Sequence, residues 1–248
     1  NMPVQEMFHD HSAEAIRQRL EGGAKASYLR DWIYGGIDGA VTTFAIVCGV
    51  VGANFSTSVI LVLGAANIVA DGFSMAASNY TGSKAENDEF DRIRAHEEQQ
   101  IERDPKGELQ EIREIYRAKG FEDQDLERAV QIITSNKRLW VDTMMTEEYG
   151  LPMTERSPVT AAIGTFIAFL LCGLVPLLPF TLSAGILTRP EATIWSLILT
   201  AITFFTIGSI KARWSLVVWW RSAIETSVIG LGAAVIAFFI GYGLRSFI

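Results

Sequence analysis

The chain has 248 residues, of which 49% are hydrophobic and 20% charged, and its formal net charge is −7. This composition excludes both an ordinary soluble domain and a plain membrane bundle, unless the charges are confined to one part of the chain. They are: residues 82–157 hold 19 of the 28 acidic residues and 12 of the 21 basic ones, and so carry the whole net charge.

The first 30 residues are predicted to form a cytoplasmic amphipathic segment. A short amphipathic helix begins near Ser12 and is followed by a break at Gly22-Gly23. The basic-then-apolar order of a cleavable signal peptide does not occur here. The two cysteines, Cys48 and Cys172, both lie in apolar runs further along, where they indicate small buried residues and not a disulfide framework.

Residues 31–81 contain two apolar runs separated by a short uncharged turn, NFSTS. The runs extend from about Trp32 to Ala53 and from about Val59 to Tyr80. Each is close to the ~20 residues that a helix needs to cross about 30 Å of hydrocarbon. The sequence therefore predicts transmembrane helices one and two, joined as a hairpin.

Both predicted spans contain an acid, Asp38 in the first and Asp71 in the second. A charged side chain at the centre of a bilayer costs roughly 2.5–3.5 kcal/mol or more, so such residues are commonly functional. Asn67, Asp71 and Met75 follow at i, i+4 and i+8, which places them on one helical face. At about 1.5 Å per residue, Asp38 and Met75 lie roughly 8–9 Å from the cytoplasmic ends of their helices.

These membrane acids have a structural and a functional interpretation. A protonated, hydrogen-bonded acid can hold two helices together, and Met75 can be ordinary packing. Two acids with an amide and a thioether at matched depth favour a binding site instead. Carboxylate with thioether is a mixed hard and soft ligand set, which suits a borderline divalent metal such as Fe²⁺ better than Mg²⁺ or Ca²⁺.

Residues 82–157 are predicted to form a cytoplasmic three-helix domain inserted between spans two and three. No helix breaker except Gly82 follows Tyr80, so the second span is expected to continue out of the membrane. Asp104-Pro105 and Lys119-Gly120 punctuate the region, with Pro at a helix start and Gly at a helix end. The third helix is predicted to run from Phe121 to Gly150.

Some acids of this domain have basic neighbours at helical spacing, which indicates a solvated face. The pairs are Asp88 with Arg92, Glu98 with Arg94, and Glu114 with Arg117. Other acids have no basic residue three or four positions away: Glu108, Glu111 and Glu148. These three, with Met144 and Met145 one turn before Glu148, predict a metal site. Glu97 joins them less securely, because Arg94 lies three residues earlier.

Residues 158–248 are predicted to hold transmembrane helices three to five, at about Val159–Phe180, Ile194–Ile210 and Ala223–Tyr242. Pro176 and Pro179 predict a kink or exit at the end of the third. Basic residues in short flanks mark the cytoplasmic side of a membrane protein. Seven such residues flank one side and two the other, which predicts a cytoplasmic N-terminus and acidic domain and a C-terminus on the opposite side: Arg17, Arg19, Lys25, Arg30, Lys211, Arg213 and Arg221 against Arg189 and Arg245.

These residues leave two classes of function open. One is a metal transporter with a cytoplasmic metal-binding domain. The other is a membrane-anchored metal protein, either a carboxylate-bridged di-iron oxidase or a metal sensor. Di-iron oxidases normally use Glu-x-x-His pairs, but the three histidines, His9, His11 and His96, form none. No Gly-x-x-x-x-Gly-Lys loop for phosphate occurs either. The transporter is therefore favoured over an enzyme, and no enzyme cofactor or nucleic-acid partner is expected.

Three stretches of the chain resemble the plant vacuolar iron transporter family. They are GGIDGAVTTFAIVCGVVGA, ILVLGAANIVADGFSMAASNYTGSKAE and the Glu-rich insert before the third span. The resemblance implies a five-span homodimer in the vacuolar membrane that exports Fe²⁺ from the cytosol in exchange for protons, with its C-terminus lumenal. It also implies that Mn²⁺, Co²⁺ and Zn²⁺ are handled, so these ions serve as surrogates for Fe²⁺.

The resemblance also implies roles for individual residues. Asp38 and Met75 correspond to ligands along the transport path, which lies between the first spans of the two protomers. The cytoplasmic metal-binding set corresponds to Glu97, Glu108, Glu111, Met144, Met145 and Glu148. Gln100 departs from the family pattern, because a second Glu is expected three residues after Glu97. An amide is a weaker ligand, so either this site is depleted or its ligands are shifted toward Glu98 or Glu102.

Overall fold

The computed structural model describes residues 10–21, 26–182, 186–214 and 217–247. Every regular element in these ranges is a helix, which confirms the all-α prediction. The chain divides into two compact units. The first contains Ser27–Thr81 and Pro158–Ile248, the second contains Gly82–Ser157, and the N-terminal residues are divided between them.

Five helical segments are long and apolar enough to cross a membrane, which confirms the predicted number of spans. The first two are α2 (Leu29–Gly52) and α3 (Thr57–Arg103). The third is formed by α7 (Pro158–Leu174), η2 (Val175–Leu177) and α8 (Leu178–Thr181). The fourth and fifth are α9 (Arg189–Lys211) with η4 (Ala212–Trp214), and α10 (Trp219–Leu244) with η5 (Arg245–Phe247). These five segments form the membrane unit, apart from the C-terminal part of α3.

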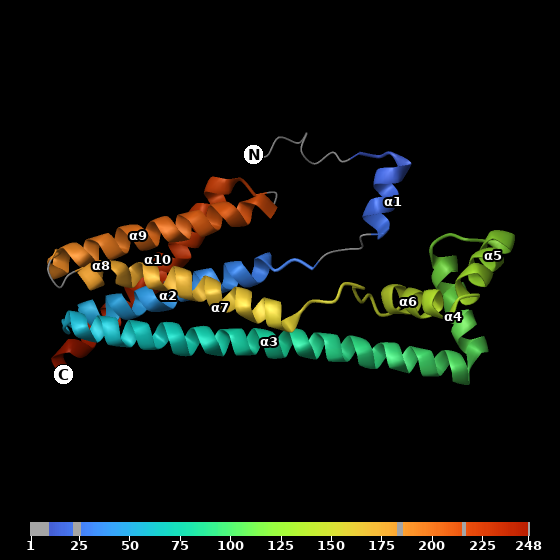
Figure 1. Cartoon of the computed structure of the whole chain (residues 1–248), viewed down its shortest axis with the longest axis horizontal. Helices are drawn as coiled ribbons and strands as arrows, with labels where there is room; N and C mark the ends of the chain where they lie inside the picture. The colour runs from blue at the N-terminus through green and yellow to red at the C-terminus, as the bar shows by residue number, and fades with distance from the viewer. Residues whose placement is uncertain (1–9, 22–25, 183–185, 215–216, 248) are drawn as a thin grey trace. The chain divides into compact units, whose positions relative to one another are not determined.

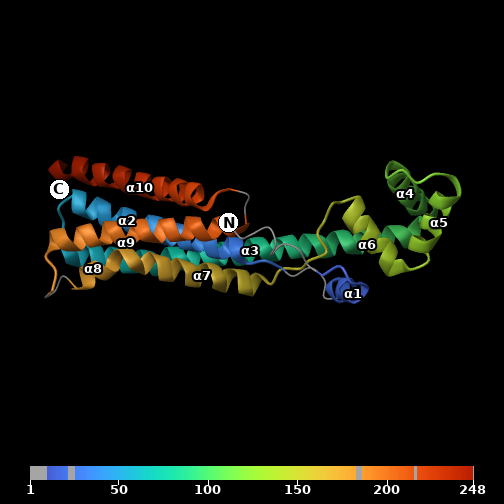
Figure 2. The ribbon, with the colours of Figure 1, turned by 90° about the horizontal axis from the view of Figure 1, so that it is seen from above.

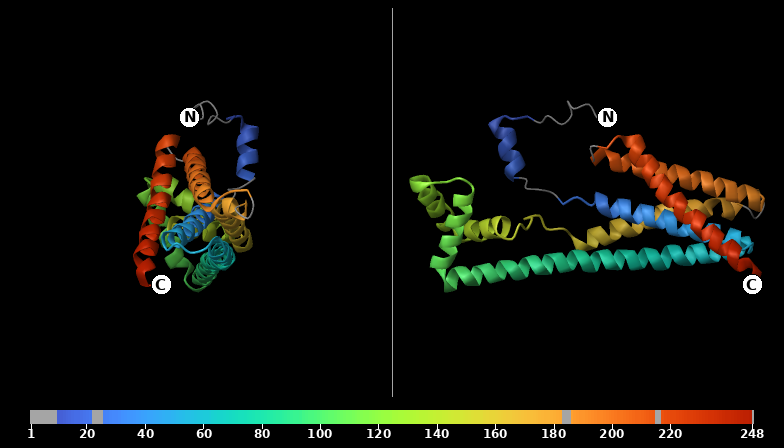
Figure 3. Two further views of the ribbon diagram at one scale, coloured as in Figure 1. Left: turned by 90° about the vertical axis from the view of Figure 1, so that its left-hand side faces the viewer. Right: turned by 180° about the vertical axis from the view of Figure 1, so that it is seen from behind.

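Helix α2 lies in the middle of the membrane unit and packs against α7, α9 and α10 (Figure 3, left). Glycine makes the closest of these approaches possible. A Cβ on Gly39 would lie 2.4 Å from the backbone oxygen of Phe169 in α7, and one on Gly241 in α10 would lie 2.0 Å from that of Gly49. Small residues let helix backbones approach in this way inside a membrane. The sequence that surrounds Asp38 therefore fixes α2 closely against its neighbours.

The two prolines of the third span interrupt its helix as predicted. The α-helical segment α7 ends at Leu174, a 3₁₀ turn contains Pro176, and α8 begins just before Pro179. Proline lacks the N–H that would continue the α-helical bonding. The Pro176 carbonyl accepts a hydrogen bond from the Ser196 hydroxyl of α9 at 2.7 Å. The kink is thus joined to the neighbouring span.

The second span continues without a break into the second unit, as the absence of a helix breaker after Tyr80 predicted. Helix α3 has 47 residues, from Thr57 to Arg103 (Figure 1). At 1.5 Å per residue its length is about 70 Å, more than twice the thickness of a hydrocarbon core. Asp71 and the candidate ligand Glu97 therefore lie on one continuous helix.

The second unit, residues 82–157, combines the C-terminal part of α3 with three short helices. They are α4 (Pro105–Ala118), α5 (Asp123–Thr134) and α6 (Lys137–Glu147), seen at one end of Figure 2. Each contributes to one apolar core, together with α3: Ile101, Ile112, Leu126, Val130, Ile133, Trp140, Val141, Met144 and Met145. Pro105 is the first residue of α4, as predicted. Asp104 caps this helix by accepting a hydrogen bond from the Gly107 N–H at 3.1 Å.

The third helix of this unit was predicted as one segment from Phe121 to Gly150, and this detail is wrong. The structure has two helices, because α5 ends at Thr134 and α6 begins at Lys137. Asn136 separates them: its side chain accepts a hydrogen bond from the Leu139 N–H at 3.2 Å. Asparagine is a strong N-cap residue, so it starts a new helix here instead of continuing the old one.

The N-terminal segment contains α1 (Ala13–Glu21), a helix where one was predicted. Its apolar side chains Ile16 and Leu20 are exposed. The predicted break at Gly22-Gly23 and the basic residue Lys25 lie outside the described residues.

Candidate metal-binding residues in the two units

Asp38 and Asp71 come from the two adjacent spans α2 and α3, and their carboxyls lie close enough for the charges to interact. Asp38 is half-buried and Asp71 exposed in the single chain, and Met75 is half-buried one turn after Asp71. Two like charges this close repel unless a proton or a cation neutralises one of them. The pair can therefore hold a cation, a proton, or each in turn.

Two amides on the same face of α3 bind side chains of α2 above and below these acids. The Asn67 amide donates to Thr42 Oγ1 at 3.2 Å. The Asn79 amide donates to Asp31 Oδ1 at 2.9 Å. Asn67, Asp71, Met75 and Asn79 recur every four residues and thus lie along one helical stripe. The polar residues of α2 and α3 therefore face one another over several turns.

Asp31 and Asn79 were not identified from the sequence. Asp31 is only 2% exposed. Besides Asp31, the Asn79 amide donates to Thr165 Oγ1 at 2.7 Å and to the Ala161 carbonyl at 3.3 Å, both on α7. One amide thus joins three spans. A signal was present, because Asn79 continues the four-residue series by one step and Asp31 lies two turns before Asp38.

In the second unit, residues 82–157, the predicted acids differ sharply in burial. Glu97 of α3 is 2% exposed and Glu108 of α4 is 5% exposed. Glu111 and Glu148 are exposed. Charged residues are rarely buried unless they are paired. Glu97 and Glu108 are therefore the two members of the set whose positions need an explanation.

One oxygen of each buried carboxyl has no hydrogen-bond partner. These atoms are Glu97 Oε2 and Glu108 Oε2, which are inaccessible to solvent and unbonded to any described residue. Glu97 Oε1 accepts a hydrogen bond from the Tyr149 hydroxyl at 2.7 Å. A buried acceptor left unbonded is destabilising by about 1–3 kcal/mol, and by more when it is charged. Two such atoms in one unit indicate that a cation or proton completes the site.

Electrostatics links the four predicted glutamates. Burial raises the pKa of Glu108 to about 7, with further contributions from the charges of Glu111, Glu97 and Glu148. Burial also raises the pKa of Glu148, helped by Glu111 and Glu97. The carboxyls thus lie near enough to disfavour one another's ionisation, which a divalent cation would reverse.

The acids do not yet form a closed coordination shell. Among the described residues, no three His, Cys, Asp or Glu side chains converge closely enough to hold one metal ion. Binding would therefore require these side chains to move inward, and the exposed Glu111 and Glu148 are the ones free to do so.

Met144 and Met145 lie in the apolar core of the unit. Both are completely buried and belong to the cluster that includes Ile112 and Val130. This packing accounts for their burial, and their role as thioether ligands stays a prediction. Gln100, the residue that departs from the family pattern, is half-buried on α3, one turn after Glu97.

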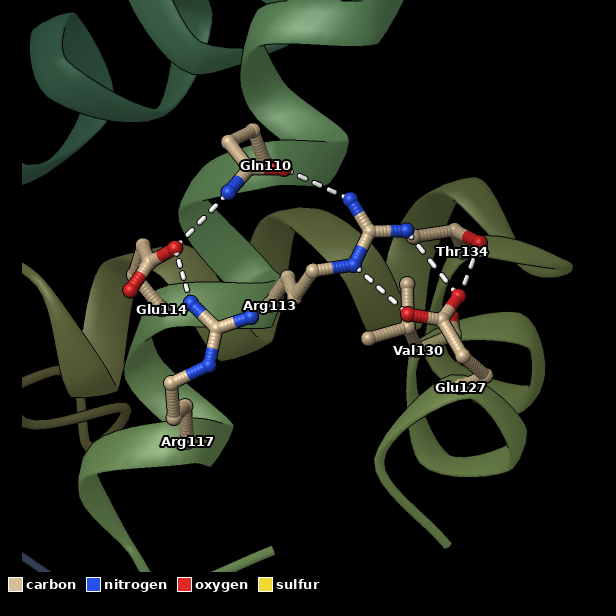
Figure 4. Close-up of polar contacts among 7 residues, drawn as sticks. All are labelled: Gln110, Arg113, Glu114, Arg117, Glu127, Val130 and Thr134. Carbon is tan, nitrogen blue, oxygen red and sulfur yellow. Dashed lines mark hydrogen bonds and ion pairs between the residues drawn. The ribbon is translucent and has the colours of Figure 1, made fainter. Parts of the chain in front are cut away.

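Two of the three predicted ion pairs form, and other acids of this unit are also paired. Arg113 of α4 binds Glu127 of α5 through Nε at 2.8 Å and through Nη2 at 3.0 Å, and binds Gln110 at 2.6 Å (Figure 4). The predicted pair Glu114–Arg117 forms. These groups are on the solvent side of α4 and α5, where such ion pairs are common and contribute little.

The predicted pair between Arg94 and Glu98 also forms. It leaves Glu97 without an ion pair to Arg94. The Arg94 guanidinium lies 3.6 Å from Glu98 and 2.9 Å from Asp142. The expected pair Asp88–Arg92 is replaced by Glu89–Arg92, at 3.9 Å. Glu108, Glu111 and Glu148 have no ion pair to a described residue within 4.0 Å, as their spacing predicted.

Comparison with known proteins gives a consistent result along most of the chain. Residues 29–242 match the VIT family. The chain is 33% identical over 211 residues to vacuolar iron transporter 1 of Arabidopsis thaliana, covering 85% of this chain and 83% of that protein. It is 33% identical over 217 residues to the vacuolar iron transporter of Plasmodium berghei, covering 84% and 79%. For vacuolar iron transporter 1 of Oryza sativa the identity is 31% over 231 residues, covering 93% and 89%.

Proposed function

Because the chain belongs to the VIT family, we propose that it transports Fe²⁺ from the cytosol into the vacuole in exchange for protons. Its relatives are named vacuolar iron transporters. The observation that carries the proposal is the pair of membrane carboxyls, Asp38 and Asp71, on adjacent spans beside Met75. The family is one of transporters and not of enzymes, which removes the di-iron oxidase as an alternative.

The transport step uses Asp38 and Met75 as ligands, with Asp71 beside them. A carboxylate and a thioether together favour Fe²⁺, Co²⁺ and similar ions over Mg²⁺ and Ca²⁺. A carboxyl must lose its proton before it binds metal. Metal and proton therefore compete for Asp38, and a site that faces each side of the membrane in turn exchanges one for the other.

Residues 82–157, which we place in the cytoplasm, collect metal before transport. Glu97 and Glu108 offer two buried oxygens without partners, and Glu111 and Glu148 supply further carboxylates at their edge. Met144 and Met145 are assigned to the same set. Zn²⁺, Mn²⁺ and Co²⁺ are suitable surrogates for Fe²⁺ in binding experiments on this unit.

The proposed setting is the vacuolar membrane, with the N-terminus and residues 82–157 in the cytoplasm and the C-terminus in the lumen. The asymmetry of basic residues in the short flanks supports this orientation. The protein is further proposed to act as a homodimer in which the path lies between the first spans of the two protomers.

The experiment that tests this function is metal uptake into sealed vesicles that contain the purified protein and an internal pH reporter. The intact protein is expected to accumulate Fe²⁺ or Co²⁺ while protons leave the lumen. Asp38→Asn and Met75→Ala should each abolish both signals. Glu225→Gln is the matched control, because Glu225 is an exposed acid at the start of α10 outside the proposed path.

Full metal-coupled proton movement by the Asp38→Asn protein would contradict the proposal. So would uptake of Fe²⁺ that is inhibited by millimolar Mg²⁺, because the ligand set should reject that ion. Metal uptake without proton movement would support metal transport but contradict the exchange of metal for protons.

A further inference from the structure

Tyr149 contacts the buried carboxyl of Glu97 and has no assigned role. We infer that Tyr149 is a positioning residue that makes Glu97 a one-oxygen metal ligand, and thereby biases the cytoplasmic site toward transition-metal ions and against Ca²⁺. The inference rests on the proposed function of residues 82–157 as a metal-capturing unit. It concerns how that site selects among metals.

The chain reversal after α6 places the Tyr149 side chain. Gly150 has φ +64°, the left-handed conformation that glycine adopts at helix ends. The Leu151 N–H then donates to the Met145 carbonyl at 3.0 Å. Leu151 packs against the apolar core. Residue 149 is thus held between a capped helix end and an anchored side chain.

The phenol occupies one oxygen of Glu97 and leaves the other free. Its hydroxyl donates to Oε1 at 2.7 Å, whereas Oε2 is buried without a partner. With Oε1 held by the Tyr149 hydroxyl, a metal that approaches Glu97 meets Oε2 alone.

A carboxylate limited to one oxygen discriminates between metals. Ca²⁺ takes six to eight oxygen ligands and commonly uses both oxygens of a glutamate. Zn²⁺ and its first-row neighbours accept fewer ligands, and a single carboxylate oxygen suffices for each. Keeping Oε1 bonded to Tyr149 removes a ligand that Ca²⁺ needs, and it orients the oxygen that a transition metal uses.

The test measures Co²⁺ and Ca²⁺ binding to the full-length protein in lipid nanodiscs by titration calorimetry. All variants carry Asp38→Asn and Met75→Ala, which remove the proposed membrane site. Tyr149→Phe is expected to weaken Co²⁺ binding about 10-fold, the usual effect of losing a partner of a metal ligand. Ca²⁺ binding should stay constant or strengthen, so the Co²⁺/Ca²⁺ preference should fall by at least the same factor. The visible spectrum of bound Co²⁺ should change as its ligand geometry changes.

Tyr116→Phe is the matched control. It removes a phenol hydroxyl from the same unit, where Tyr116 packs edge-on against Phe121 at 5.4 Å, and should leave the affinities and the Co²⁺ spectrum unchanged. An equal loss of Co²⁺ and Ca²⁺ affinity in Tyr149→Phe would overturn the inference and leave a merely structural tyrosine. Unchanged affinities and spectrum would also overturn it.

A second variant separates this inference from the function it rests on. Glu97→Gln combined with Glu108→Gln should abolish Co²⁺ binding in the same background. If it binds Co²⁺ like the parent, the capture function itself fails. If binding is lost but Tyr149→Phe keeps the parent's metal preference, only the role of Tyr149 fails.

Discussion

Asn79 and Glu97 lie on the same helix, α3, one in each unit, and their surroundings differ. Asn79 is bonded to three partners on α2 and α7. Glu97 is bonded through one oxygen to Tyr149, and its other oxygen has no partner. Eighteen residues, or about five helical turns, separate them along α3. The fold supplies hydrogen-bond acceptors for the Asn79 amide, whereas it leaves one oxygen of Glu97 without a donor.

This difference in hydrogen bonding distinguishes polar groups that stabilise the fold from polar groups that are available to bind a ligand. A buried polar group that is fully bonded stabilises and specifies a fold. A buried charge without a partner is destabilising, so it persists where something outside the fold completes it. On this basis we assign Asn79 to the scaffold, and we propose that Glu97 and Glu108 are part of a binding site.

The largest effect on stability is expected in the membrane unit, from Asn79→Leu. This change removes the donor to the buried Asp31 carboxyl and to Thr165, and should lower the free energy of unfolding by about 3 kcal/mol, the upper part of the range for such losses. Thermal unfolding in detergent would measure it. Asn67→Leu is the control, because Asn67 bonds only the half-buried Thr42 among the described residues. If the Asn79→Leu protein is as stable as the Asn67→Leu protein, the assignment of Asn79 to the scaffold is contradicted.

The next effect concerns Glu108 and should have the opposite sign. Its pKa is about 7 in the folded protein against the usual value of 4.5. The folded state therefore holds this proton more tightly, so its stability should fall as the pH rises from about 4.5 through 7. Glu108→Gln should remove this loss and stabilise the metal-free protein by about 1–3 kcal/mol at pH 8, and by almost nothing at pH 4. Equal effects at both pH values would show that Glu108 is not held protonated by its surroundings.

The smallest effect is expected from the paired acids on the solvent side of α4 and α5. Arg113→Ala breaks the bidentate contact with Glu127, but such exposed pairs contribute little. The unfolding temperature and the affinity for Co²⁺ should change within experimental error. A marked loss of metal binding would mean that the paired acids, and not only the unpaired ones, belong to the site.

The fold could be predicted because its signals are local. Runs of about 20 apolar residues gave the five spans, the absence of a breaker after Tyr80 gave the long α3, and Asp104-Pro105 gave the start of α4. The split between α5 and α6 was missed, because a single capping asparagine, Asn136, decides it. Its helix-breaking effect depends on the backbone around it and not on composition.

The candidate site was only partly predictable. Spacing identified the acids without basic neighbours, and it revealed the stripe of α3 as far as Met75. It could not reveal that Glu97 and Glu108 are buried while Glu111 and Glu148 are exposed, because burial depends on how four helices pack. The bond from Tyr149 to Glu97 joins residues 52 positions apart, and no local pattern predicts such a contact.

The central claim is that the buried carboxyls without hydrogen-bond partners, Glu97 and Glu108, bind metal. Its most direct test is the unfolding temperature of the full-length protein at pH 8, with and without Co²⁺. The protein should carry Asp38→Asn and Met75→Ala, so that metal binding is confined to residues 82–157. Co²⁺ at 100 times its dissociation constant should stabilise this parent by about 2.7 kcal/mol. Adding Glu97→Gln and Glu108→Gln should raise the metal-free unfolding temperature and remove the gain from Co²⁺. A variant that is less stable without metal, yet gains as much from Co²⁺ as the parent, would contradict the account.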